Sequence, residues 1–177
     1  MVGIKMTRKD ISDSVKGQDS VSIEAFQSGM LVLFTRKLAV LTKDFKNKPE
    51  CECLATATIV MGAAALEALF LEVAYKKDRE LYKDENFRKR AGVPKKYEIL
   101  TNQTLEETFP DVLKLWESRL ALSHSEPDLP RTRFVGEKIN PEGAIWVADT
   151  LDKFATQIWG DQMPKWFTET TGLLPLI

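Results

Sequence analysis

The stretch Leu54–Val73, LATATIVMGAAALEALFLEV, decides the fold class of this chain. Good helix formers dominate it, and it predicts a helix from about Glu52 to Leu81. Apolar residues cover more than half of the circumference of this helix, and a helix of that kind lies in the centre of a bundle. The most apolar part, Ile59–Tyr75, is interrupted by two glutamates and is shorter than the roughly 20 residues that cross a bilayer.

Amphipathic patterns on both sides of this stretch predict partner helices. Ile23–Phe45 carries apolar residues at steps of three and four. A helix from Pro110 or Asp111 to about His124 has Thr108 as its expected N-cap. The last helix should cover residues 141–159, with Asn140 as its cap, Pro141 at its first position and Gly160 after its end.

The remaining segments carry weaker signals. Tyr97–Thr108 is expected to be a short helix or an irregular connection, and residues 131–139 a loop or a short strand. We therefore predict an all-α fold, an antiparallel bundle of four to six helices. Residues 1–20 should form a flexible arm, and residues 21–177 a single domain.

Composition excludes several classes of protein. The 177 residues are 44% hydrophobic and carry a formal net charge of −1, so net charge does not mark a nucleic-acid binder. The N-terminus lacks the apolar region of a signal peptide, and we expect a cytoplasmic protein without a membrane segment. Cys51 and Cys53 are too close together for a useful disulfide, and with one histidine they make no convincing zinc site. We expect no metal and no cofactor.

The chain's only histidine, His124, follows Arg119 by five residues near the end of an apolar helix. Histidine is the side chain that moves protons near neutral pH, and the forked guanidinium of arginine binds phosphate well. On an ideal helix, five residues separate two side chains by about 140°. The two can therefore converge only if the helix ends or unwinds between them, which the Ser/Pro/Asp-containing stretch after His124 favours.

The pattern Arg119-Leu-Ala-Leu-Ser-His124 resembles the Arg-x4-6-His signature of the HEPN superfamily of helical ribonucleases and their relatives. The earlier segment AALEALFLE, with Glu67 inside it, is similar to the family helix that directs a polar residue at the motif. The helix at 141–159 resembles the family's closing helix. Leu120 departs from the family, whose active members usually carry a polar residue after the arginine.

The resemblance implies a metal-independent endoribonuclease of the toxin or phage-defence type. Arg119 would hold the scissile phosphate, His124 would act as acid or base, and Glu67 would orient them. One histidine cannot readily do both proton transfers, so a homodimer with a composite site is implied. RNA would be the substrate, and an antitoxin or another operon partner protein could bind the chain.

Other residues could contribute to binding. Ser123 and Ser125 could donate hydrogen bonds to phosphate or cap the helix end. Residues 76–96 contain nine Lys or Arg against four Asp or Glu, and Lys89 and Arg90 lie among them. This basic segment is either a solvated helix end or a surface that attracts phosphates.

Two other interpretations stay open. Leu120 favours a catalytically inactive HEPN-like module that dimerises and binds RNA, nucleotide or a partner protein. The histidine could also merely stabilise a helix C-terminus through its charge, in a helical scaffold unrelated to the family.

Overall fold

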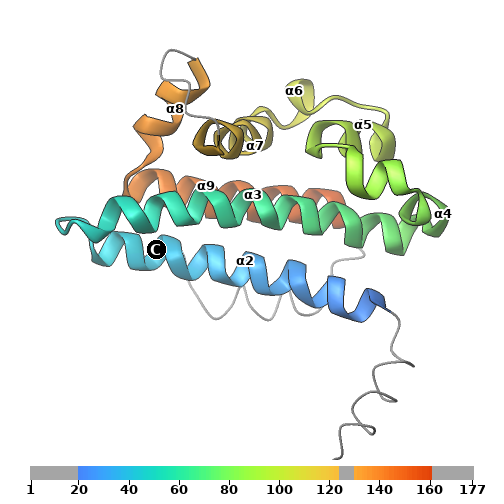
Figure 1. Ribbon diagram of the computed structural model, residues 1–177, viewed down its shortest axis with the longest axis horizontal. Helices are drawn as coiled ribbons and strands as arrows, with labels where there is room; N and C mark the ends of the chain where they lie inside the picture. Colours follow the sequence, from blue (N-terminus) through green and yellow to red (C-terminus); the bar gives the residue numbers. More distant parts are fainter. Residues whose placement is uncertain (1–19, 124–129, 161–177) are drawn as a thin grey trace, which may run out of the picture.

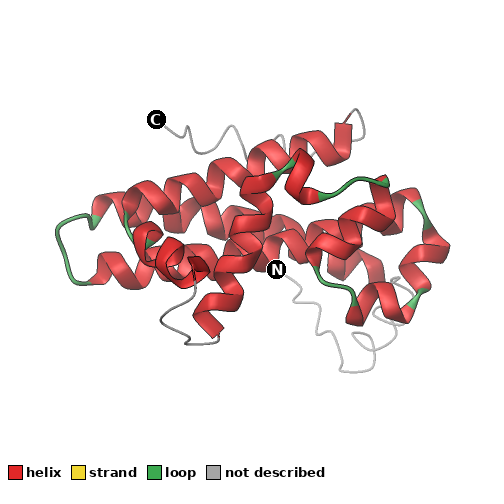
Figure 2. Ribbon diagram, turned by 90° about the horizontal axis from the view of Figure 1, so that it is seen from above, coloured by secondary structure: helices red, strands yellow, loops and turns green. Residues whose placement is uncertain are grey.

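The computed structural model describes residues 20–123 and 130–160 (Figure 1). Within these ranges the chain is helical and contains no strand, so the all-α prediction is confirmed for this part (Figure 2). The elements in chain order are α2 (Ser20–Asp44), α3 (Glu50–Lys77), α4 (Arg79–Lys83), the π-helix η1 (Asn86–Arg90), α5 (Val93–Thr101), α6 (Leu105–Thr108), α7 (Pro110–Ser123), α8 (Pro130–Lys138) and α9 (Pro141–Trp159).

Helix α3 occupies the centre of the fold, as its composition predicts. It lies between α2 on one side and α5, α7 and α8 on the other, with α9 packed along both α2 and α3 (Figure 1). Leu66, Leu69 and Phe70 of α3 are fully buried. The ring of Phe70 lies 5.4 Å from that of Phe154 in α9 and 6.3 Å from that of Tyr97 in α5. These contacts join three helices in one core.

The length and composition of α3 would also allow it to cross a membrane, and half of its most apolar window is buried inside the protein. The other long helices supply that cover. Half of this apolar window therefore packs against other parts of the protein.

The boundaries of α9 are those predicted from the sequence. The Asn140 side-chain oxygen accepts a hydrogen bond of 2.7 Å from the backbone N–H of Gly143, and Pro141 begins the helix. Gly160, with φ of +54°, follows its last residue in a conformation that favours glycine. Position 143 requires a glycine, because a Cβ there would clash with the carbonyl oxygen of Lys138.

Several sequence-based expectations were wrong. The central helix stops at Lys77 rather than at Leu81, because the Asp78 side chain accepts hydrogen bonds from the N–H groups of Glu80 and Leu81 and starts α4. Thr108 does not cap α7. It ends α6, where its hydroxyl donates to the carbonyl of Thr104.

Residues 131–139, expected to be a loop or a strand, are helical through Lys138 as part of α8. The ring of Phe134 meets Trp146 of α9 edge-on at 5.6 Å, and Val135 is buried. Tertiary contacts therefore stabilise a helix whose own sequence is strongly polar. The predicted arm over residues 1–20 lies outside the described residues except for Ser20, and the single-domain organisation stays a prediction.

Candidate functional site

The structure brings together two of the residues that the motif singles out. Glu67, in the middle of α3, accepts a hydrogen bond from Nη1 of Arg119 in α7, and the two form an ion pair. The two residues are 52 positions apart in the chain, and each side chain is 36% exposed. The ion pair is therefore accessible from solvent, although Glu67 belongs to the central helix α3. A catalytic role for these residues stays a prediction.

The ring of Trp116 lies beside Arg119. The Arg119 guanidinium carbon lies 5.4 Å from the centre of the half-buried ring of Trp116, within the range of a cation–π contact. A Cβ at Gly92, which precedes α5, would be in ordinary van der Waals contact with the same ring, 3.5 Å from its nearest atom. The first turn of α5 thus borders the site.

Lys96 of α5 is a residue that the sequence analysis missed. It is only 4% exposed, and its Nζ donates a hydrogen bond of 3.4 Å to the carbonyl of Arg88. Nζ also lies 5.9 Å from the centre of the Phe87 ring. Burial lowers the pKa of the Lys96 ammonium, and the negative charge of Glu67 partly counteracts this. Lys96 thus belongs to the electrostatic surroundings of Glu67.

The spacing of apolar residues around Lys96 could have identified this lysine from the sequence. Val93, Lys96, Tyr97 and Leu100 follow the three- and four-residue steps of one helix face. Val93 and Tyr97 are buried and Leu100 is half-buried. A lysine inside such an apolar stripe is unusual, because lysine is almost never fully buried without a partner.

Two further expected site residues, Lys89 and Arg90, lie on a different element from the pair. Lys89 and Arg90 are exposed on η1, and Lys89 forms an ion pair of 2.5 Å with Glu85. In residues 20–123 and 130–160, no hydrogen bond or ion pair links either of them to Glu67 or Arg119. Their predicted role in attracting phosphate therefore depends on surface charge rather than on direct contact with the pair.

The histidine end of the motif falls outside the described residues. His124 and Ser125 lie there, and Ser123 is placed only as the last residue of α7. Because α7 is helical through Ser123, the expected unwinding between Arg119 and His124 does not occur before that residue. Leu120, at the position that departs from the family pattern, is half-buried.

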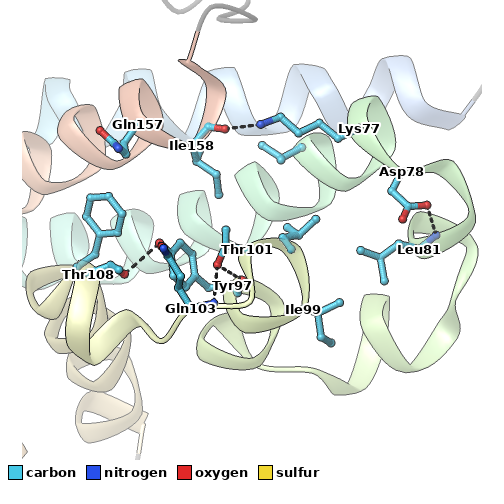
Figure 3. Close-up of a pocket in the computed structure, with 13 residues that line it drawn as sticks. Lys77, Asp78, Leu81, Tyr97, Ile99, Thr101, Gln103, Thr108, Gln157 and Ile158 are labelled. Atoms are coloured by element: carbon cyan, nitrogen blue, oxygen red, sulfur yellow. Dashed lines mark hydrogen bonds between the residues drawn. The ribbon is translucent and has the colours of Figure 1, made fainter.

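A separate cavity of about 650 Å³ opens between the ends of α3, α5, α6 and α9 (Figure 3). The hydroxyl of Tyr97 lies within hydrogen-bonding distance of the Thr108 hydroxyl, at 3.0 Å, and of the Gln103 side-chain oxygen, at 3.4 Å. Lys77 Nζ donates a 2.8 Å hydrogen bond to the carbonyl of Ile158 at the wall of the cavity. Its size would suit a small polar molecule, but Glu67, Arg119, Lys89 and Arg90 are not among its lining residues.

The structure offers few ligands for a metal. Within residues 20–123 and 130–160, no three His, Cys, Asp or Glu side chains are grouped to hold an ion. Cys51 is a buried free thiol and Cys53 an exposed one.

Comparison of the chain with protein-family models, with curated proteins and with solved structures finds no match.

Proposed function

We propose that the chain is a HEPN-like, metal-independent endoribonuclease of the toxin or phage-defence type. The observation that carries the proposal is the Glu67–Arg119 ion pair, which joins the two helices that resemble the paired helices of that family. Arg119 lies in the last turns of α7, and His124 follows that helix in the sequence. An antiparallel, HEPN-like bundle of four to six helices, functioning in the cytoplasm, is part of the proposal.

The proposed reaction requires a cation and two proton transfers. The ribose 2′-oxygen attacks the phosphorus and forms a new P–O bond while a base takes the 2′-hydroxyl proton. The bond from phosphorus to the 5′-oxygen breaks, and an acid gives that oxygen a proton. The products are a 2′,3′-cyclic phosphate and a 5′-hydroxyl. Arg119 would bind the phosphate oxygens and stabilise the charge that develops on them.

The number of histidines implies that two copies of the chain act together. His124 can serve as base or as acid in one turnover, and a twofold dimer would supply a second copy to the same cleft. Glu67 would orient Arg119 between the two helices. Ser123 and Ser125 would donate hydrogen bonds to phosphate, while Lys89 and Arg90 would raise the local concentration of RNA through their charge.

A non-catalytic HEPN-like module is the second candidate. The observation that favours it is Leu120, whose half-buried apolar side chain cannot supply the polar contact usual after the family's arginine. Such a module would dimerise and bind RNA, a nucleotide or a partner protein without cleaving. In both candidates, an antitoxin or operon partner protein is a possible partner.

Growth on expression separates the two candidates. Induction of the wild-type chain in a bacterial host should arrest growth, and His124→Ala should restore it at equal protein level. Lys95→Ala, an exposed change in α5, serves as the control and should remain toxic. Equal toxicity of wild type and His124→Ala would contradict the enzyme and favour the binding module.

A further inference from the structure

The cavity between the ends of α3, α5, α6 and α9 is a second candidate site. Its volume of about 650 Å³ falls within the roughly 300–1,000 Å³ of pockets that hold small molecules. Glu67 and Arg119 do not line it, and the proposed nuclease activity gives it no role. A ligand bound there would therefore be a property of the chain beyond the proposed function.

The buried part of the lining is mainly apolar. Val73 of α3 is 1% exposed and Ile158 of α9 is 7% exposed. Leu100 and Phe109 also line the cavity and are half-buried. Ile99, another lining residue, is 41% exposed although its side chain is large and apolar. Because covering such surface removes it from water, this lining favours a ligand with an apolar body.

The polar side chains of the lining are the ones that water reaches. Gln103, Thr108 and Gln157 line the cavity and are exposed. Lys77, the last residue of α3, is exposed as well, and its Nζ donates a 2.8 Å hydrogen bond to the carbonyl of Ile158 (Figure 3). The cavity is thus amphipathic, and the polar end of a ligand would face this exposed side.

The charges of the lining indicate the sign of that polar end. Among the lining residues, Lys77 carries a positive charge and Asp78 a negative one. Oδ1 of Asp78 accepts hydrogen bonds of 3.1 and 3.0 Å from the N–H groups of Glu80 and Leu81, so this carboxylate is engaged at the start of α4 (Figure 3). An ammonium group has three hydrogen-bond donors, and the carbonyl of Ile158 takes one. Lys77 therefore retains donors for an anion.

We propose that this cavity binds a small organic acid, with the carboxylate of the ligand at Lys77 and its apolar body against Val73 and Leu100. One ammonium group matches the single charge of a carboxylate, whereas the double charge of a phosphomonoester would need further cations. The bound ligand covers Ile99 and removes its exposed surface from water.

Two probes of the same shape and different charge test this proposal. 4-Phenylbutyrate carries a carboxylate on an apolar body, and 4-phenylbutyramide has the same body with a neutral amide. Their affinities for the full chain are measured by ligand-detected NMR titration, on the scale of a Kd of about 1 mM for ligands of this size. The wild type should bind the carboxylate about tenfold more tightly than the amide, because hydrogen bonds to charged groups are the stronger ones.

Lys77→Met keeps the length of the side chain and removes its charge. It should weaken binding of 4-phenylbutyrate about tenfold and change that of 4-phenylbutyramide by less than about twofold, so that the preference for the carboxylate is lost. A merely structural defect would weaken both probes alike. Lys76→Met is the matched control, because Lys76 is the adjacent exposed lysine of α3 and does not line the cavity. It should retain the preference of the wild type.

Ile99→Ser tests the apolar contact. The Ile99 side chain is exposed, so its replacement should leave the fold intact, which far-ultraviolet circular dichroism checks for every variant. Loss of this apolar surface should weaken binding of both probes about threefold without changing the preference between them.

The results decide the proposal without reference to RNA cleavage, because the titrations contain no RNA. A preference for the carboxylate that Lys77→Met removes and Lys76→Met retains supports the organic-acid site. Equal affinity of the wild type for the two probes overturns it, and so does absence of saturable binding. A preference that persists in Lys77→Met, or affinities that Ile99→Ser leaves unchanged, would place the probes elsewhere and also overturn it.

Discussion

Gly62 in the middle of α3 permits a close approach of three helices, and its replacement by alanine should weaken the fold. A Cβ at this position would lie 2.4 Å from Cγ1 of Val147 in α9 and 3.6 and 3.7 Å from the two methyl groups of Leu115 in α7. Ordinary contacts between carbon atoms are about 3.5–4.0 Å. Val147 and Leu115 are both fully buried, so neither can move into solvent.

The size of the effect is the difference between two opposing terms. Alanine stabilises a helix interior by about 1 kcal/mol relative to glycine. Overpacking a core costs about 1–3 kcal/mol. The upper part of that range applies here because valine has one strongly preferred rotamer in a helix. Gly62→Ala should therefore lower the free energy of unfolding by about 1–2 kcal/mol, with a Tm about 2–4 °C lower per kcal/mol.

Thermal and urea unfolding followed by circular dichroism measure this change. Gly136→Ala in α8 is the matched control, because no atom lies within 4 Å of a Cβ built there and the helix propensity of alanine should act alone. Val147→Ala in the Gly62→Ala background removes the clashing methyl group, so the double variant should lose less stability than the sum of the single changes. Stabilisation by Gly62→Ala equal to that by Gly136→Ala would show that residue 62 is not tightly packed against Val147.

Substitutions at Asp152, Asn140 and Arg119 test three further features of the structure. Burial raises the pKa of Asp152 above 3.8 although Arg36 acts against the rise, so the folded protein holds this proton more tightly than the unfolded chain does. The free energy of unfolding should fall as pH rises from 3.8 through the raised pKa, and urea titrations at several pH values should show that Asp152→Asn flattens this part of the profile. Asn140→Ala removes the cap of α9 and should cost about 1 kcal/mol in urea denaturation, whereas Asn140→Asp should retain most of it. Arg119→Lys should weaken binding of a fluorescently labelled 2′-O-methyl RNA, which cannot be cleaved, about tenfold when affinity is measured by anisotropy, because an ammonium group cannot make the forked contact with phosphate. Unchanged affinity would argue against a phosphate-binding role for this arginine.

Elements whose signals are local could be predicted from the sequence. The start of α9 depends on Asn140 and Pro141 and its end on Gly160, and these residues act on their own neighbours. The central position of α3 follows from the breadth of its apolar surface. Such features need no knowledge of the rest of the fold.

Elements that depend on distant contacts could not be predicted in this way. Residues 131–138 are strongly polar, and they become helical where Phe134 meets Trp146 and Val135 enters the core. The end of α3 at Lys77 depends on Asp78, whose carboxylate caps the following turn. A continuous helix-forming composition on both sides conceals that break.

In the candidate site, too, some residues could be predicted from the sequence and others could not. Glu67 and Arg119 could be predicted to meet, because a carboxylate on the central helix needs a partner and the motif supplies one. Lys96 was included in a basic segment considered as a whole, so its individual position inside an apolar stripe was missed. Its neighbour Lys95 has the same charge but is exposed, and only the helical register separates the two.

The proposed nuclease activity is tested by incubating a labelled mixed RNA pool in EDTA with the wild type and, separately, with His124→Ala. The wild type should produce fragments with 2′,3′-cyclic phosphate and 5′-hydroxyl ends, and the variant should produce none. Absence of cleavage by a folded, dimeric wild type, or equal cleavage by His124→Ala, would contradict the proposal.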